Sequence, residues 1–170
     1  IWSHVSGLFT PIIPSGLIEL SDRFIFSSSC SYEAKNITVL NDELKTRLGV
    51  VSSGVGFVKP KLKTFITNSN LRAGYMGSLN FSKLHPRIID FLAMVDVEDF
   101  KMQIWGDEIN RTVLCKQCEL AGKPKLVEFS GYTERPADAL ASLDLFIYLL
   151  NPTHYGTAEN VLLEAMSLGV

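Results

Sequence analysis

The chain has 170 residues, of which 46% are hydrophobic and 20% charged, which is typical of a globular protein and excludes a disordered chain. Its formal net charge of −2 gives no electrostatic basis for binding nucleic acid or an anionic membrane surface. No run of about 18 apolar residues occurs, so we expect no helix that spans a membrane. The chain begins with Ile1 rather than Met, and we therefore expect it to be a piece of a longer protein.

In the first 70 residues the pattern is irregular. Residues 22–29 and 49–57 predict strands, and residues 32–48 predict a helix between them. The basic and polar stretch 59–70 has no clear period, and we interpret it as either a linker or a mobile excursion. Residues 1–70 are accordingly expected to be an inter-domain segment together with the tail of a preceding N-terminal half.

From residue 71 onward, strands and helices are expected to alternate. Short apolar runs predict strands, and longer segments with apolar residues at helical spacing predict helices bounded by Pro or Gly. The predicted strands cover 71–77, 101–105, 125–129 and 144–150, and the predicted helices cover 84–96, 108–121 and 136–143, with a fourth helix after residue 156.

Strand–helix repeats with short connections predict an α/β fold over residues 71–170, with a doubly wound parallel sheet covered by helices on both faces. Such sheets bind ligands outside the carboxyl ends of their strands. The loops that follow the predicted strands should therefore lie along one edge of the sheet, and these loops are 77–83, 106–108, 131–134 and 151–159.

The loop after the first of these strands is one candidate binding element. Gly77 would let the backbone approach a ligand closely. Lys83 would place a cation near the start of the next helix, where backbone amides already favour an anion. The alternative for Lys83 is a solvated surface lysine, the usual environment of that residue type.

The last helix carries the second candidate. Thr157 can cap it, with Glu159 and Asn160 in its first turn. Glu159 either compensates the helix dipole or meets a sugar hydroxyl, since it would repel a phosphate. Glu164 lies deeper, in an apolar stretch, where it needs either a ligand with two adjacent hydroxyls or an internal salt bridge. His154, in the preceding loop, either donates to a phosphate or sugar or is structural.

Two other groups are interpreted as structural. The acidic run 96–99 follows a helix and precedes a strand, which places it as a solvated turn at the edge opposite the candidate loops. Cys115 and Cys118 have C-x-x-C spacing but lie inside a predicted helix without a second ligand pair, so we interpret them as ordinary helix cysteines. Neither a P-loop nor a Ser–His–Asp arrangement occurs, and no metal or cofactor is expected.

Several segments resemble the donor-binding half of GT-B glycosyltransferases, and glycosyltransferase family 4 in particular. Residues 73–95 resemble the strand–loop–helix that opens that half, with Gly77-Ser78-Leu79 and Lys83 at the positions of the family's G-R-L and lysine. Residues 101–108 and 127–134 resemble its second and third strands, and residues 139–170 end in the family's L-L-E-A-M-x-x-G-V. Residues 20–60 resemble the segment that links the two halves.

The resemblance implies one Rossmann-like half of a GT-B fold, truncated at its C-terminal end, that binds a nucleotide-diphospho-sugar donor. It implies that Glu164 binds the ribose hydroxyls of the donor and that Lys83 binds its diphosphate. Lys83 and Glu159 are the implied catalytic residues. The other implied donor-binding residues are Gly77, Ser78, Gly131, Tyr132, His154, Gly156, Thr157 and Asn160.

Two positions depart from the family pattern. Ser78 stands where the family has the arginine of G-R-L, so one cation for the diphosphate is missing. Gly156 stands where the first glutamate of the family's pair is expected. Glu159 is one candidate to replace it. The alternative is a small insertion that aligns Tyr155 and Gly156 with the family's Phe-Gly.

The implied function is that of a glycosyltransferase fragment. The whole enzyme would transfer a hexosyl group to an acceptor hydroxyl with retention, in polysaccharide biosynthesis. The acceptor would be a glycan or a lipid-linked molecule bound by a missing N-terminal domain, so the fragment alone is expected to be inactive. The full-length protein is expected in the cytoplasm, with peripheral association with the membrane left open.

Three alternatives to this function remain. The first is a nucleotide-sugar epimerase of the GT-B type, and the second is a non-catalytic nucleotide-binding or scaffold domain. The third is a dinucleotide-dependent dehydrogenase, which is disfavoured because no predicted strand is followed by G-x-G-x-x-G.

Overall fold

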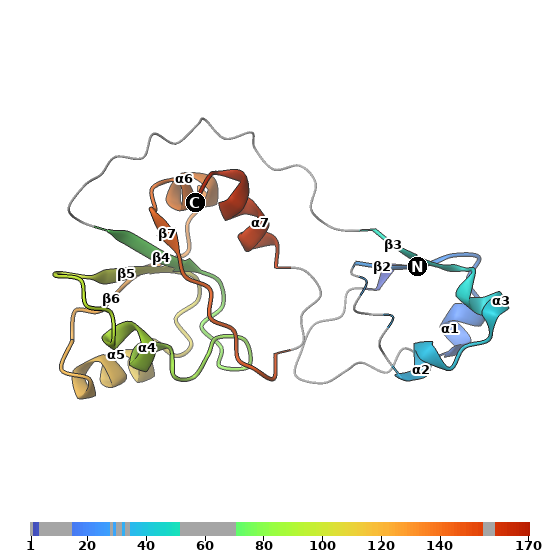
Figure 1. Cartoon of the computed structure of the whole chain (residues 1–170), viewed down its shortest axis with the longest axis horizontal. Helices are drawn as coiled ribbons and strands as arrows, with labels where there is room; N and C mark the ends of the chain where they lie inside the picture. The colour runs from blue at the N-terminus through green and yellow to red at the C-terminus, as the bar shows by residue number, and fades with distance from the viewer. Residues whose placement is uncertain are drawn as a thin grey trace. The chain divides into compact units, whose positions relative to one another are not determined.

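The structure, a computed structural model, describes residues 2–3, 15–27, 29, 32, 35–51, 71–154 and 159–170. The chain divides into two compact units, a smaller one of Ile1–Gly56 with Thr153–Asn160 and a larger one of Phe57–Pro152 with Val161–Val170 (Figure 1). The linker or mobile excursion predicted over 59–70 lies outside the described residues, as do Gly156 and Thr157 of the candidate site. Among the described residues, no helix has both the length and the apolar composition needed to cross a membrane.

The smaller unit contains a parallel sheet with the strand order β1-β2-β3. Its elements are β1 (Trp2–Ser3), α1 (Ser15–Glu19), β2 (Phe24–Phe26), α2 (Lys35–Thr38), α3 (Asp42–Lys45) and β3 (Leu48–Val50). Its buried side chains form a core of their own, made by Ile18, Phe24, Phe26, Ile37, Leu40 and Leu48. Residues 1–70, which were expected to be an inter-domain segment together with the tail of a preceding half, therefore include a small packed α/β body.

The helix predicted over 32–48 is wrong, because the described part of this segment forms two short helices. Asn41 lies between α2 and α3 in an extended conformation, and its side chain accepts a hydrogen bond from the Leu44 amide at 2.8 Å. An asparagine that caps a helix start in this way ends one helix and begins the next. The strand predicted within 22–29 is confirmed as β2, and the strand predicted within 49–57 begins one residue earlier, as β3.

The larger unit confirms the predicted doubly wound α/β fold. Its four strands are all parallel, in the order β6-β5-β4-β7. The strands are β4 (Arg72–Met76), β5 (Lys101–Trp105), β6 (Val127–Gly131) and β7 (Leu145–Phe146), and the helices are α4 (Ile88–Ala93), α5 (Arg111–Leu120), α6 (Pro136–Ala141) and α7 (Asn160–Ser167).

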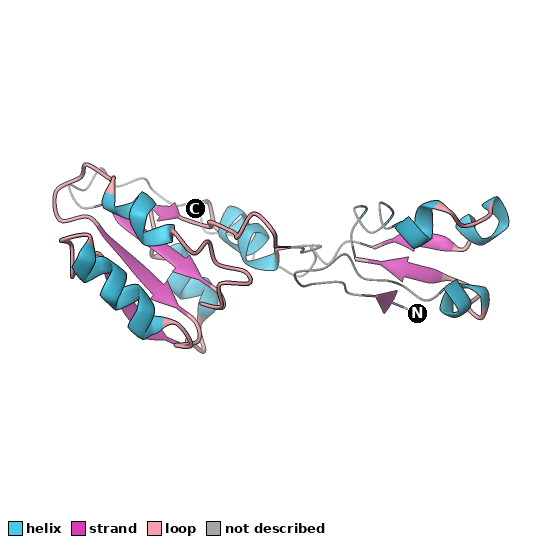
Figure 2. Cartoon of the chain, turned by 90° about the horizontal axis from the view of Figure 1, so that it is seen from below, coloured by secondary structure: helices cyan, strands magenta, loops and turns pink. Residues whose placement is uncertain are grey.

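Helices cover both faces of this sheet (Figures 1 and 2). One core holds buried side chains of α4 and α5 against the sheet, among them Ile88, Leu114 and Met102. A second core lies on the other face, where α6 and α7 pack through Leu140 and Ala165. These two cores explain why the strands are apolar on both faces.

The carboxyl ends of β4, β5 and β6 meet at one edge of the sheet. Met76 pairs with Trp105, and Trp105 pairs with Gly131. The ladder skips Ser130, because Ile104 pairs with Phe129 while Trp105 pairs with Gly131, so β6 contains a bulge. β6 ends at Gly131, two residues beyond the predicted end at 129. With the bulge, Gly131 lies level with the ends of β4 and β5.

Several elements are shorter than predicted, and one contact between two segments of the chain accounts for two of them. The helix predicted from residue 84 begins at Ile88, because Leu84 forms an antiparallel bridge with Leu150 and the His85 amide donates to the Leu149 carbonyl at 2.9 Å. The strand predicted over 144–150 pairs with β4 only at Leu145 and Phe146. The same crossing of segments 84–85 and 149–150 shortens both, since a residue bonded to another segment is not available to a regular element.

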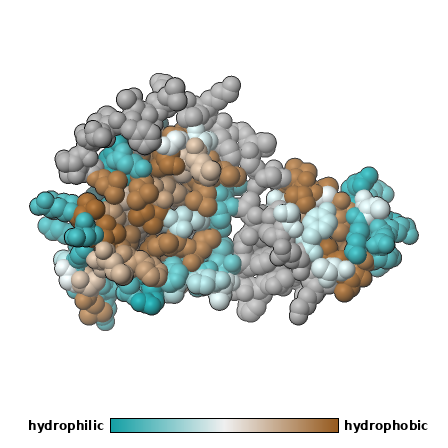
Figure 3. Space-filling view, viewed as in Figure 1, coloured by the Kyte–Doolittle hydropathy of each residue, from teal (hydrophilic) through white to brown (hydrophobic). Residues whose placement is uncertain are grey.

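The larger unit also exposes apolar side chains. Figure 3 shows them gathered over much of the described part of the unit that faces the viewer. Exposed large apolar residues of this unit are Met94, Ile109, Leu120 and Met166, each at least 68% exposed.

Candidate functional site

Three glycines line the carboxyl edge of the sheet. The Gly77 amide donates to the Trp105 carbonyl, and the Gly106 amide donates to the Gly131 carbonyl, each at 2.9 Å. Gly77 and Gly106 have φ angles of +154° and +150°, and Gly131 has +67°. A Cβ atom on Gly106 would lie 2.0 Å from the Gly77 carbonyl oxygen. These three positions therefore expose backbone without a side chain at this edge of the sheet.

A pocket of about 210 Å³ lies beside this edge. Its lining residues come from the ends of β4 and β5 and from the loop after β6, and they are Met76, Gly77, Ser78, Trp105, Gly106, Asp107, Tyr132, Thr133 and Pro136. The pocket brings together three predicted site residues, Gly77, Ser78 and Tyr132. Tyr132 is 82% exposed, so its ring offers a free face at the rim.

Asp107 was missed as a site residue by the sequence analysis, although its loop, 106–108, was predicted to lie at this edge of the sheet. Its carboxylate accepts hydrogen bonds from the amides of Leu79 at 3.2 Å and Ile109 at 3.1 Å. Asn110 extends this connection, because its side-chain amide donates to the Leu79 carbonyl at 2.8 Å. Asp107 and Asn110 therefore fix the loop after β4 on the loop after β5.

The Asp107 carboxylate is held in its charged form. Partial burial raises its pKa, but hydrogen bonds from the Ser78 hydroxyl and from the Ile109 and Leu79 amides lower the pKa by more, so it lies below its ordinary value. A carboxyl group with a lowered pKa stabilises the fold above its ordinary pKa, and this contribution disappears as the pH falls through the lowered value.

We expect Asp107→Asn to lower the free energy of unfolding by roughly 1–2 kcal/mol at pH 7, because an amide cannot accept all of these bonds. The difference between variant and wild type should shrink as the pH falls through the lowered pKa of Asp107, because the wild-type carboxylate then takes up a proton. Urea unfolding at several pH values measures it. Asp96→Asn, in an exposed turn, is the control, and a difference that stays constant with pH would contradict the assignment.

Lys83 lies in the turn before α4, five residues ahead of Ile88, and not at the helix start as predicted. It is half-buried, and its Nζ atom lies 5.5 Å from the centroid of the Tyr148 ring. It is not among the residues that line the pocket. The dipole of α4 therefore does not explain the position of Lys83. Contacts with the segment after β7 hold Lys83 instead.

Glu164 lies on α7 at the margin of the face that packs on the sheet. Val161, Ala165 and Leu168 form that face, and Glu164 is half-buried beside them. Within the described ranges, no hydrogen bond or ion pair involves its carboxylate. Of the two alternatives from the sequence, an internal salt bridge is thus not found among the described residues. Met76 and Trp105 pack in the same core as α7 and also line the pocket.

His154 and Glu159 contact each other in the smaller unit. The Nε2 atom of His154 lies 3.2 Å from Oε1 of Glu159, and the two side chains are only 9% and 18% exposed. The sequence analysis considered these residues separately, and the structure adds that each is a partner of the other. Asn160 is the first residue of α7.

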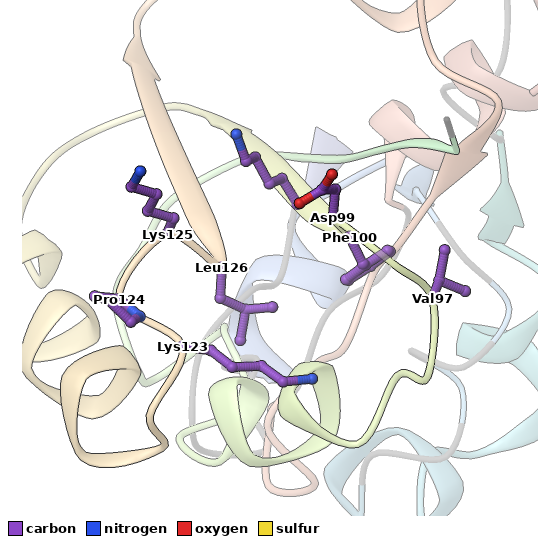
Figure 4. Close-up of a pocket in the computed structure, with 8 residues that line it drawn as sticks. Val97, Asp99, Phe100, Lys123, Pro124, Lys125 and Leu126 are labelled. Atoms are coloured by element: carbon purple, nitrogen blue, oxygen red, sulfur yellow. The ribbon is translucent and has the colours of Figure 1, made fainter. Parts of the chain in front are cut away.

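A second pocket of about 350 Å³ lies at the opposite, amino edge of the sheet (Figure 4). Phe100 and Leu126 form its apolar floor. The Lys123 ammonium donates to the carbonyls of Ala93 at 2.8 Å and Val95 at 3.3 Å, so it caps the end of α4. The acidic run 96–99 borders this pocket and is exposed, which confirms the predicted solvated turn.

Cys115 and Cys118 are free cysteines of α5, as predicted. Burial, and then the neighbouring Cys115, raise the pKa of the Cys118 thiol to about 11. The described residues contain no group of three or more His, Cys, Asp and Glu side chains arranged to hold a metal ion.

We expect iodoacetamide at pH 8 to leave Cys118 unmodified in the folded chain, since only about one thiol in a thousand would be ionised and the sulfur is buried. Cys115, which is half-buried, should react faster. Mass spectrometry of the labelled peptides distinguishes the two, and labelling in urea is the control that makes both react. Equal rates in the folded chain would contradict the burial of Cys118.

The sequence matches no protein-family model and no sequence among the curated proteins compared with it. Its fold matches solved structures. One is the lipopolysaccharide outer core galactosyltransferase WaaB in its apo form, with 19% identity and a TM-score of 0.67 over 88% of this chain and 42% of that chain. Another is Anabaena HepE in complex with UDP and glucose, with 21% identity and a TM-score of 0.71 over 89% and 44%.

A third match is WaaG, a glycosyltransferase involved in lipopolysaccharide biosynthesis, with 17% identity and a TM-score of 0.66 over 87% of this chain and 42% of that chain. At these identities the likeness shows the fold. The chain has the Rossmann-like α/β architecture of one half of a GT-B glycosyltransferase, as the resemblance implied. It spans less than half the length of each of these three proteins.

Proposed function

We propose that this chain is part of a glycosyltransferase and binds a nucleotide-diphospho-sugar at the carboxyl edge of the larger unit. The observation that carries the proposal is the row of Gly77, Gly106 and Gly131 beside a pocket at that edge. Backbone without side chains lets a ligand approach the strand ends, which is where ligands bind in sheets of this topology. The solved structures of similar fold support it, since HepE was solved with UDP and with UDP-glucose.

Three groups of residues would bind the base, the diphosphate and the ribose of the nucleotide. We assign the base to the rim formed by Tyr132 and Thr133, where an exposed ring can stack. We assign the diphosphate to Lys83 and the loop after β4, and the ribose hydroxyls to Glu164. A half-buried carboxylate with no partner among the described residues suits a pair of hydroxyl donors.

In the whole enzyme, the bond between the anomeric carbon and the diphosphate oxygen would break while the sugar bonds to the oxygen of an acceptor hydroxyl, whose proton would pass to the departing diphosphate. We expect retention and a hexosyl group, as family 4 implies. Lys83 would stabilise the departing diphosphate, with backbone amides before α7 around Thr157 and Asn160. Glu159, paired with His154, would contact the sugar, and no metal is required for these roles. A glycan or lipid-linked acceptor would be bound by an N-terminal domain of the whole protein, which we expect in the cytoplasm.

A non-catalytic nucleotide-binding domain is the second candidate, and one observation favours it. Ser78 stands at the pocket in place of a cation, and Asp107 is the only charged residue among the described residues that line it. A site with fewer cations stabilises a departing diphosphate less, while it can still bind a nucleotide. Turnover of a donor by the full-length protein would decide against this candidate.

The test of binding is calorimetric titration of the 170-residue chain with UDP, GDP and uridine. We expect a nucleoside diphosphate to bind at least about tenfold more tightly than uridine, because the diphosphate adds charge-assisted contacts. Thermal unfolding of the same sample shows that it is folded. A folded chain that binds neither diphosphate would contradict the proposed function.

A further inference from the structure

The Tyr148 ring lies in a stack of three aromatic side chains in the larger unit. Its centroid lies 5.5 Å from that of Tyr75, with 18° between the ring planes, and 5.7 Å from that of Phe146, with 21°. Tyr75 comes from the central strand β4 and is completely buried. The stack therefore holds the Tyr148 ring against the rigid part of the sheet.

The Lys83 ammonium lies over this ring. Its Nζ atom is 5.5 Å from the Tyr148 centroid, within the range of a cation–π contact. A lysine side chain has several freely rotating bonds, and a binding site has to restrict them before the ammonium can meet an anion. A fixed ring face beside the ammonium supplies that restriction in advance.

The backbone of Lys83 is held by the same segment that carries Tyr148. The Asn151 amide nitrogen donates to the Lys83 carbonyl at 2.7 Å, and the Asn151 side chain donates to the Phe81 carbonyl at 2.7 Å. The bridge between Leu84 and Leu150 continues this connection. Both ends of the lysine are thus held from residues 148–151, which follow β7.

The stack also reaches the loop that lines the pocket. The Tyr75 hydroxyl donates to the Ser78 carbonyl at 2.8 Å, and Ser78 is one of the pocket residues. One aromatic stack consequently supports the two parts of the proposed diphosphate site, the loop after β4 and the Lys83 ammonium.

We infer that Tyr148 and Asn151 are positioning residues that hold Lys83 for the diphosphate of a bound nucleotide. This inference rests on the proposed function. Neither residue needs to touch the ligand. Tyr148 acts by presenting its ring to the ammonium, and Asn151 acts by fixing the turn from Phe81 to Lys83.

The test compares Tyr148→Leu and Tyr148→Phe in calorimetric titrations with UDP and with uridine. Tyr148→Leu should weaken UDP binding about threefold to tenfold and leave uridine binding unchanged, while Tyr148→Phe, which keeps the ring, should retain wild-type affinity. In a Lys83→Met background, Tyr148→Leu should cause no further loss of UDP affinity. Asn151→Ala, which keeps the backbone bond to Lys83 but removes the bond to Phe81, should also weaken UDP binding selectively.

Four results would overturn the inference. They are wild-type UDP affinity in Tyr148→Leu, an equal loss for UDP and uridine, an equal loss in the Phe and Leu variants, and a full further loss in the Lys83→Met background. If wild type binds UDP no better than uridine, the proposed function fails and the inference fails with it. Should Tyr148→Leu not fold, the comparison of Asn151→Ala with wild type decides by the same criterion.

Discussion

Gly106→Ala is expected to lower the free energy of unfolding by roughly 3–4 kcal/mol, because two costs add at this position. The added Cβ would lie 2.0 Å from the Gly77 carbonyl oxygen, which belongs to backbone and cannot rotate away. The φ angle of +150° is in addition one that residues with a side chain rarely adopt. Urea unfolding followed by circular dichroism measures the loss.

Gly122→Ala is the matched control for this prediction. Gly122 also has a positive φ, +71°, but a Cβ atom there would meet no heavy atom within 4 Å. It should therefore lose only the conformational cost, roughly 1 kcal/mol. Equal losses in the two variants would show that the close approach of Gly106 to Gly77 is not what constrains this edge. A folded Gly106→Ala protein should also bind UDP more weakly.

Glu164→Ala is expected to weaken UDP binding by roughly tenfold to a hundredfold, because hydrogen bonds from two hydroxyls to a carboxylate would be lost. The sharper measurement is a cycle that combines this variant with 2′,3′-dideoxyuridine diphosphate, which has no ribose hydroxyls. Removal of the hydroxyls should weaken binding to wild type by the same factor and should hardly change binding to Glu164→Ala.

Glu119→Ala is the control for the Glu164 cycle, since Glu119 is an exposed carboxylate of α5, on the opposite face of the sheet. It should bind both nucleotides as wild type does. Two independent losses in the cycle, one for the hydroxyls and another for Glu164, would show that Glu164 acts on some other part of the nucleotide or through the fold.

The positions of the strands could largely be predicted from the sequence, and the boundaries set by tertiary contacts could not. β4 and β5 are apolar runs whose burial on both faces determines the ladder, so local pattern was enough. Leu84 fits the helical spacing of the residues after it, but it is bridged to Leu150, which is 66 positions away in the chain. No local pattern contains that pairing.

The residues of the candidate site likewise include some that could be predicted from the sequence and one that could not. The loops that hold Gly77, Ser78 and Tyr132 were predicted from their places after strands, and the resemblance implied these three residues as donor-binding. The structure brings them to one pocket. Asp107 was missed because its partners are backbone amides of Leu79 and Ile109, which any residue would provide. A sequence shows which residue types stand next to each other along the chain. These hydrogen bonds depend instead on how the loop after β4 and the loop after β5 meet in the fold.

The charged residues near the end of the chain show a further limit of prediction from the sequence. Glu164 was singled out because a carboxylate in an apolar helix is unusual, and that signal is local. The contact of His154 with Glu159 was not predicted, although only four residues separate them. Residue types alone do not show which side chains will lie close together in the fold.

Hydrogen exchange with and without saturating UDP tests most directly whether the nucleotide binds at the carboxyl edge of the sheet. The proposed function predicts slower amide exchange in residues 77–80, 106–109 and 131–134, which follow β4, β5 and β6. Protection confined to 97–101 and 123–126, around the pocket at the amino edge, would contradict it. So would an unchanged exchange pattern in a chain that calorimetry shows to be saturated with UDP.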